Sequence, residues 1–278
     1  MAPKSSDPSK SNSTVTLMQT QLPMWPQNLR GLPNVFARSA FFNIANVRSG
    51  PRKNYKRREI ASLQGITITH SGEEMRQDDC DVFLQILHLA RMQNLGTVVR
   101  FTAHSMLTEL GWTRNTGSYK RLADCLDRQT ASAVAVTVSG KDLVRENYTG
   151  SLIRLFRWKE DGDAAGPASR EWTVVLEPEI IALFGPSSYS HLNWKTRLKL
   201  SPLGKWLHAF YHTHAEPFPY KVETLHRISD SQTKDLRHFR YKLKAALAKL
   251  VEEDFFLSAE IDARTDLVSV VRKHQTLL

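Results

Sequence analysis

Cysteine is nearly absent from this chain of 278 residues, in which only Cys80 and Cys125 occur. Two isolated cysteines give neither a disulfide framework nor a paired-cysteine metal site, so we expect reduced, buried thiols. Long hydrophobic runs are also missing: the mean hydropathy is -0.38, and no run approaches the roughly 18 apolar residues of a membrane span. Residues 1–16 lack the apolar core of a secretory signal. These absences predict a cytoplasmic protein without a membrane partner.

Acidic residues are the minority among the charged ones. The chain has 28 Asp and Glu against 38 Lys and Arg, which gives a formal net charge of +10 and an isoelectric point of about 9.7. A basic excess of this size indicates a polyanionic partner, most often nucleic acid. The positive charge is clustered, since residues 48–58 read RSGPRKNYKRR and a second cluster spans residues 234–244. This clustering argues against a merely solvated basic surface.

Sequence motifs of nucleotide hydrolysis and catalysis are lacking as well. A phosphate loop needs Gly-Lys followed by Ser or Thr, but residues 204–206 read Gly-Lys-Trp. Residues 211–214 read Tyr-His-Thr-His, which only superficially resembles the tyrosine nucleophile and His-apolar-His metal pair of a nicking nuclease. His208 and His212 lie one helical turn apart, yet no HExxH motif surrounds them. We therefore expect no enzymatic activity, no metal and no cofactor.

What the chain does contain is one pattern written twice. Residues 101–112 predict a short helix and a turn, and residues 116–129 predict a longer helix. Residues 221–229 and 232–253 repeat this arrangement, and alternating apolar residues typical of a hairpin follow each copy. A short helix, a turn, a longer basic helix and a hairpin form the pattern of a winged helix-turn-helix. We therefore predict an α+β fold with two tandem winged helix-turn-helix domains.

The remaining elements of the first half follow from periodicity and capping residues. Thr102 is expected to cap a short helix that ends at Gly111. Residues 134–138 alternate as a strand does, with residues 151–158 as the expected partner and the polar residues 139–150 as the wing. Asp79 and Asp81 suit the early turns of a helix, where the dipole favours negative charge. The other expected elements are two strands within 57–69, a helix over 72–93, a strand at 172–176 and a short helix at 179–184.

Composition and these elements together predict four parts of the chain. Residues 1–20 are rich in Ser, Lys and Pro and are expected to form a disordered tail. Residues 21–56 are expected to form an arm that ends in the first basic segment. Residues 57–190 would then form the first winged-helix domain and residues 191–278 the second, with a boundary near 185–195.

The second long helix supplies the strongest candidates for DNA recognition. One apolar stripe is formed by Leu236, Phe239, Leu243, Leu247 and Leu250. About a quarter turn away, a polar flank suited to a major groove is formed by Lys234, Arg237, His238, Arg240, Tyr241 and Lys244.

The first long helix and the first basic segment supply further candidates. In helix-turn-helix docking the N-terminal turns of the second helix approach base edges. The candidates there are Arg114, Asn115, Thr116, Ser118, Lys120 and Arg121, whereas Tyr119 fits the core equally well. Phosphate contacts are expected from Arg52, Lys53, Lys56, Arg57 and Arg58.

Three ordered stretches carry a resemblance to a known family. They are residues 32–42 (LPNVFARSAFF), residues 109–112 (ELGW) with the helix that follows, and residues 200–229. Over about residues 21–273 the chain resembles the TrfA-type initiators of plasmid replication. The resemblance implies two winged-helix domains that bind repeated double-stranded origin sequences, called iterons. It further implies origin opening with a host initiator and the replicative helicase, and an equilibrium between monomers and self-associated dimers in the bacterial cytoplasm.

The family also carries a short peptide that docks on the host sliding clamp. Here the similar residues are Gln21, Leu22, Met24 and Trp25. A tethered peptide of this kind places apolar anchors in a pocket of its partner. The alternative is an arm packed on the first domain, and the sequence leaves both open.

Two other functions remain as alternatives. A transcriptional regulator with the same fold would bind an operator in a promoter, and the sequence barely separates it from an initiator. A nicking initiator would form a covalent tyrosyl-DNA product, which incubation with supercoiled origin DNA and a divalent cation would reveal.

Overall fold

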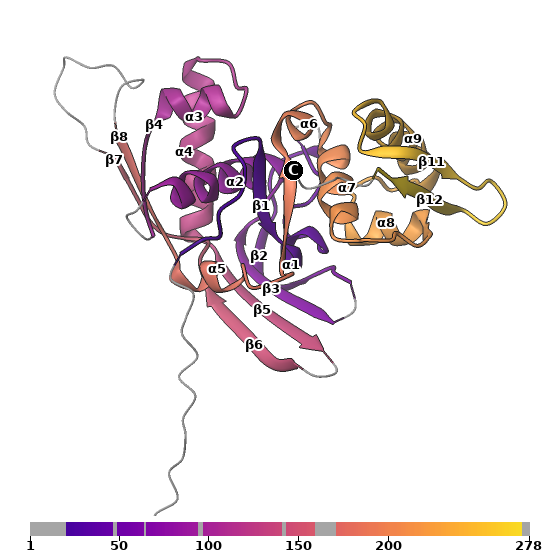
Figure 1. The fold of residues 1–278 in the computed structure, drawn as a ribbon, viewed down its shortest axis with the longest axis horizontal. Helices are drawn as coiled ribbons and strands as arrows, with labels where there is room; N and C mark the ends of the chain where they lie inside the picture. Colours follow the sequence, from indigo (N-terminus) through magenta and orange to yellow (C-terminus); the bar gives the residue numbers. More distant parts are fainter. Residues whose placement is uncertain are drawn as a thin grey trace, which may run out of the picture.

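The computed structural model describes residues 21–46, 49–63, 65–93, 97–140, 143–158 and 171–273. Within these ranges it is a mixed arrangement of helices and small antiparallel sheets (Figure 1). The expected disordered tail, residues 1–20, lies outside the described residues.

Six elements of the first half form one structural unit. In chain order they are α2 (Gln77–Met92), β4 (Val98–Thr102), α3 (Ala103–Glu109), α4 (Thr116–Ala131), β7 (Ile153–Trp158) and β8 (Glu171–Leu176). The three strands form an antiparallel sheet in the order β4-β8-β7. Thr102 caps α3 as expected, since its side chain accepts a hydrogen bond from the Ser105 amide at 3.1 Å. Gly111 follows the helix with a φ of +66°, a conformation that glycine adopts without strain.

Six elements of the second half repeat this order. They are α7 (Pro202–His212), β10 (Tyr220–Lys221), α8 (Val222–Ile228), α9 (Leu236–Glu252), β11 (Phe256–Ile261) and β12 (Leu267–Arg272). Their sheet has the order β10-β12-β11, so in both units the third strand lies between the first and the second. The repeat seen in the sequence is therefore also a repeat of topology. Figure 1 shows this second unit, in orange and yellow, at one end of the molecule.

A second sheet in the first half departs from the sequence-based expectation. It contains β2 (Asn54–Ile60), β3 (Ile66–Glu73), β5 (Ala133–Gly140) and β6 (Leu143–Gly150), in the order β2-β3-β5-β6. The prediction that residues 134–138 pair with residues 151–158 was wrong, because β5 pairs with β3 and β6, whereas β7 pairs with β8. Alternation correctly marks β5 as a strand with one buried face, but it does not identify the partner.

The N-terminal segment packs onto the first half as an arm. β1 (Leu29–Pro33) pairs with β9 (Tyr189–Asn193), which joins two segments far apart in the sequence. The short helices of this region are α1 (Asn34–Ala37), α5 (Pro178–Ala182) and α6 (Trp194–Leu198). The phenylalanines at positions 36, 41 and 42 are buried beside Phe83 of α2.

The buried apolar side chains form two clusters. The first contains residues from Leu22 to Trp194 together with Ala209, and the second contains residues from Leu200 to Val270. Helix α7 contributes to both, since Ala209 lies in the first cluster and Phe210 in the second. The two units thus meet across α7, and the chain passes from one cluster to the other just after α6.

Candidate nucleic-acid interface

Helix α9 has the two faces that its spacing predicts. Phe239, Leu243, Leu247 and Leu250 are buried, and Leu236 is half-buried. The flank that faces solvent includes the exposed candidates Arg237, His238, Tyr241 and Lys244, and Lys234 is exposed just before the helix. Tyr241 is 75% exposed, so its ring is available to a partner. This flank therefore lies outside the protein core.

Arg240 is placed differently from its neighbours on this helix. Its guanidinium donates two hydrogen bonds of 2.8 Å to the carboxylate of Asp266, in the turn between β11 and β12. This hydrogen bonding raises the pKa of Arg240 above its ordinary value. In this arrangement the side chain ties α9 to the β11–β12 hairpin, which takes the place of the wing in the predicted fold.

The start of α4 is less basic than α9. Asn115 caps this helix by accepting a hydrogen bond from the Ser118 amide at 2.9 Å. Lys120 pairs with Asp124 one turn along at 3.0 Å, and Arg121 stacks on Trp112 with 3.9 Å between guanidinium carbon and ring centre. The other candidates include the exposed Arg114 and Thr116 and the half-buried Ser118. Tyr119 packs partly against the first core.

The first basic segment divides into exposed and engaged cations. Lys56 and Arg57 are exposed on β2 and suit phosphate contact. Arg52, in contrast, pairs with Asp78 at 2.9 Å and with Asp79 at 2.6 Å, and its side chain is 14% exposed. The expectation that Arg52 touches phosphates therefore conflicts with its position, since two carboxylates already hold its charge. The two remaining cations of the segment donate hydrogen bonds to the turn before α9: Lys53 to Gln232 and Arg58 to Asp230.

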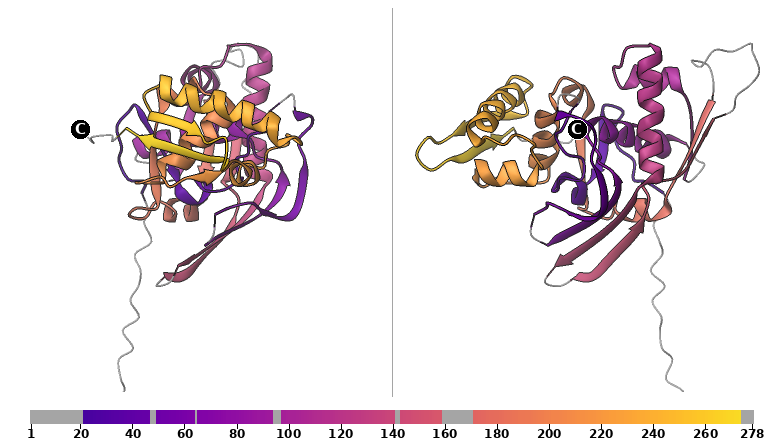
Figure 2. Two further views of the ribbon diagram at one scale, coloured as in Figure 1. Left: turned by 90° about the vertical axis from the view of Figure 1, so that its right-hand side faces the viewer. Right: turned by 180° about the vertical axis from the view of Figure 1, so that it is seen from behind.

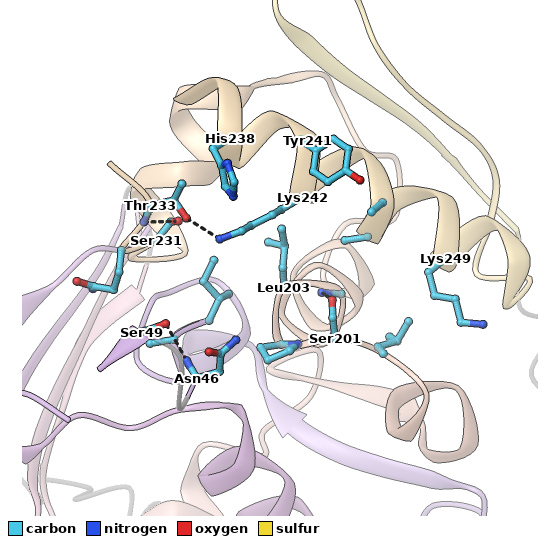
Figure 3. Close-up of a pocket in the computed structure, with 18 of the residues that line it drawn as sticks. Asn46, Ser49, Ser201, Leu203, Ser231, Thr233, His238, Tyr241, Lys242 and Lys249 are labelled. Carbon is cyan, nitrogen blue, oxygen red and sulfur yellow. Dashed lines mark hydrogen bonds between the residues drawn. The ribbon is translucent and has the colours of Figure 1, made fainter. Parts of the chain in front are cut away.

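A groove of about 950 Å³ runs between α9 and the start of α7 (Figure 3). His238, Tyr241 and Lys242 line it from α9, and Ser201 and Leu203 line it from α7. In Figure 3 the Lys242 side chain extends across the groove toward the turn before α9, where it donates a 3.2 Å hydrogen bond to Thr233. Lys242 and Lys249 also line the groove and were not among the sequence-based candidates, although their spacing of seven residues places both on one side of a helix.

A second hollow of about 430 Å³ continues this surface toward α4. It shares four lining residues with the groove: Ala45, Asn46, Leu200 and Pro202. Arg121, Asp124 and Arg128 border it from α4. One flank of each long helix therefore faces a continuous concave surface. Figure 1, and Figure 2 from behind, show α3 and α4 on the same upper side of the molecule as α9.

The peptide expected to dock on a sliding clamp is partly occupied by the core. Trp25 is only 4% exposed, stacks on Phe184 with 6.0 Å between ring centres, and donates a 3.3 Å hydrogen bond to His88. Leu22 is also buried, whereas Gln21 is exposed and Met24 is 70% exposed. In this conformation residues 21–25 pack on the first half as an arm, which was the alternative to a clamp-docking peptide. Docking on a partner would require Trp25 to leave its pocket.

The histidines of α7 belong mainly to the second unit's core. His208 is fully buried, and burial lowers the pKa of its ring well below the ordinary value. The Tyr211 hydroxyl, which the nicking alternative would use as nucleophile, is buried as well. Among the residues that the structure describes, no group of three His, Cys, Asp or Glu side chains could hold a metal ion. In the same part of the chain, no helix is both long and apolar enough to cross a bilayer.

Comparison with known proteins assigns the family. A family model described as TrfA protein matches residues 10–272. The chain belongs to the TrfA family. The curated plasmid replication initiator protein TrfA of Escherichia coli is 30% identical over 228 residues, which cover 81% of this chain and 58% of that protein. The match thus spans little more than half the length of this TrfA relative, and the family is one of plasmid replication initiators.

Solved structures support the fold of this TrfA-family chain. A crystal structure of domains 2 and 3 of RctB matches with a TM-score of 0.58 at 13% identity, and covers 88% of this chain and 99% of that one. A second structure of RctB domains 2 and 3 matches with a TM-score of 0.52 at 13% identity, over 81% of this chain and 84% of that one. The likeness at this identity concerns the mixed α/β architecture alone.

Proposed function

We propose that this protein is a plasmid replication initiator that binds double-stranded origin repeats in a sequence-specific manner through two tandem winged helix-turn-helix modules. The observation that carries this proposal is the continuous concave surface bordered by one flank of α4 and one flank of α9. Two long helices that face one surface suit successive major grooves on one side of a duplex, whose centres lie about 10 base pairs apart. One chain then covers roughly 20 base pairs, or two helical turns.

The two helices contribute differently to recognition. Arg237 and Tyr241 are exposed on α9, and the guanidinium of Arg237 can bind guanine in a bidentate manner. At the start of α4, Asn115 and Lys120 lie in the turns that approach base edges. Lys56, Arg57 and Lys242 contact phosphates, which adds affinity without sequence information. The loss of one phosphate contact should reduce the number of counterions released on binding by about one, which makes the affinity less dependent on salt.

The relatives' role extends the proposal beyond DNA binding. Origin opening then proceeds in the bacterial cytoplasm together with a host initiator and the replicative helicase. A host sliding clamp is a further partner if residues 21–25 leave the arm. Self-association into dimers would compete with binding to a single repeat.

Competitive binding to DNA tests the proposal. The protein is titrated against labelled duplexes that carry direct repeats from its own plasmid origin, with scrambled duplexes of equal length as competitors. The expected result is at least a hundredfold preference for the repeat at physiological salt. Equal affinity for both duplexes would contradict sequence-specific initiation, and a covalent tyrosyl-DNA product would show a nicking enzyme instead.

A further inference from the structure

Helix α2 begins with three aspartates whose side chains turn to different parts of the molecule. Asp79 and Asp81 are buried, and Asp78 is half-buried. From the sequence, Asp79 and Asp81 were expected merely to suit the positive end of the helix dipole. The structure gives each of the three specific cationic partners instead.

Two of these aspartates hold α4. The carboxylate of Asp79 forms an ion pair with Arg128 at 2.9 Å. The backbone carbonyl of Asp79 accepts a 3.1 Å hydrogen bond from the side chain of Gln129. Asp78 pairs with Arg121 at 3.3 Å. Burial opposes ionisation of Asp78, yet Arg52 and Arg121 together keep its pKa below the ordinary value. The beginning of α2 therefore fixes α4 along its length.

The third aspartate contacts α6, which ends the first half, and α7, which begins the second unit. Asp81 pairs with Arg197 of α6 at 2.8 Å, and both side chains are at most 1% exposed. The same carboxylate also pairs with Lys205 of α7. Arg197 further donates to the side chain of Gln77 at 2.9 Å and to the backbone carbonyl of Lys205 at 3.1 Å. Because α7 packs against α9 in the second core, this network connects α2 to the second long helix.

Further ties across the junction surround this buried centre. Trp206 donates a 3.0 Å hydrogen bond to the carbonyl of Ser39, and Arg38 donates a 2.9 Å hydrogen bond to the hydroxyl of Thr213. Arg58 of β2 pairs at 3.1 Å with Asp230, a residue with positive φ in the turn before α9. The contacts lie on separate elements of both units, so they restrict rotation as well as separation.

A buried ion pair permits little movement of the groups that form it. Asp81 binds the Lys205 ammonium and Arg197 donates to the Lys205 carbonyl, so moving α7 would take partners from two charges that are shielded from water, and such states are strongly disfavoured. A junction held by exposed ion pairs alone would be softer, because water can replace each partner. The two units are therefore held in one preferred relative placement.

We propose that the acidic start of α2 is a spacing gauge: it holds α4 and α9 at one separation and one rotation, so that the protein accepts a single spacing between the two halves of its DNA site. This inference rests on the proposed function, because it presumes that both helices enter one duplex. It assigns Asp81, Arg197 and Lys205 a role in specificity that acts through the placement of the two helices and not through a base contact.

A spacer series tests the gauge. One or two base pairs are inserted between the halves of the origin repeat, and each insertion turns one half by roughly 35° and moves it by about 3.4 Å relative to the other. The wild-type protein should lose at least tenfold in affinity with two inserted pairs. Asp81→Asn should bind the native repeat more weakly but lose threefold or less on insertion, because its units can adjust.

Two further variants keep the test decisive. Lys205→Met removes one tie to Asp81 and leaves the buried pair with Arg197 in place, so it serves if Asp81→Asn does not fold, and it should show an intermediate penalty. Asp254→Asn is the matched control, since Asp254 pairs with Lys273 at 3.4 Å within the second unit and lines neither the groove nor the second hollow. It should keep the full wild-type penalty.

The outcomes separate the gauge from the function on which it rests. A wild-type penalty of tenfold that persists unchanged in folded Asp81→Asn or Lys205→Met would overturn the gauge and leave two-helix binding intact. A wild-type protein that prefers no repeat over scrambled DNA would instead contradict the proposed function. Relief of the penalty in the two variants, but not in Asp254→Asn, supports the gauge.

Discussion

His70 shows how one buried side chain makes stability depend on pH. It lies on β3 between Phe41 and Tyr55, with 5.2 Å and 5.8 Å between ring centres, and it is 1% exposed. Neither ring nitrogen has a hydrogen-bond partner among the residues that the structure describes. Burial therefore lowers the pKa of His70 from 6.5 to about 4, because the charged ring would lose its solvation.

The sign of the resulting pH dependence follows from proton binding. Below pH 6.5 His70 is protonated in the unfolded chain, but in the folded chain it stays neutral until the pH reaches about 4. The free energy of unfolding therefore falls as the pH falls through this interval. Between pH 7 and pH 4.5, the free energy of unfolding should fall by about 2–3 kcal/mol less in His70→Leu than in the wild type. Urea unfolding at both pH values measures this difference, and parallel losses in the two proteins would contradict it.

Arg237 and Arg240 illustrate two different roles on one helix flank. Arg237 is exposed, so Arg237→Ala should weaken the specific site by about 1–3 kcal/mol and change random-DNA binding little if the guanidinium reads a base. A gel-shift titration on both duplexes checks this. An equal loss on random DNA would make Arg237 a phosphate contact.

Arg240 should act through the wing, because Asp266 holds its guanidinium. Asp266→Asn should then weaken specific binding about as much as Arg240→Ala does, since both release the same tie. If Arg240 contacts DNA directly, Asp266→Asn would instead strengthen binding, because it removes a nearby negative charge. Affinities of the two variants on the same origin repeat separate these cases.

At the level of elements, the cap of α9 links helix stability to DNA affinity. The Asp235 side chain accepts a 2.8 Å hydrogen bond from the Arg237 amide. Asp235→Ala should lower stability by about 1 kcal/mol through the lost cap, yet raise DNA affinity at low salt because a negative charge leaves the interface. Asp235→Asn keeps the cap and removes the charge, so it should raise affinity without the loss of stability. Thermal unfolding and low-salt titrations of both variants test the pair, and a gain in affinity for neither would argue against α9 lying at the DNA.

The elements were largely predictable where local signals decide them. The helices, the cap at Thr102 and the apolar stripe of α9 follow from residue types and spacing. The strands that pair with β5 could not be predicted in this way, because strand pairing depends on what covers each face and edge of a sheet. The alternation of apolar residues carries no such information. The ion pairs of Arg52 and Arg240 could not be predicted for a similar reason: their acidic partners come from other segments that only the fold brings near.

At the scale of the whole molecule, the relation between the two units is what the sequence could not reveal. The repeat predicts two similar modules, but the side on which each presents its long helix depends on the junction through α2, α6 and α7. There Asp81 meets Arg197 and Lys205, which lie 116 and 124 residues further along the chain. The concave surface between α4 and α9 is a consequence of that junction. Membership in a family of plasmid replication initiators supports the proposed initiator role, and the orientation of the helices supports how that role would be performed.

Methylation interference on a single origin repeat, bound by monomeric protein, tests this arrangement most directly. The account predicts two clusters of purines whose methylation blocks binding, with centres about 10 base pairs apart on one face of the duplex. Arg237→Ala should remove one cluster, and Asn115→Ala should weaken the other. A single cluster, or two clusters separated by about half a helical turn and therefore on opposite faces, would contradict the claim that α4 and α9 enter neighbouring major grooves together.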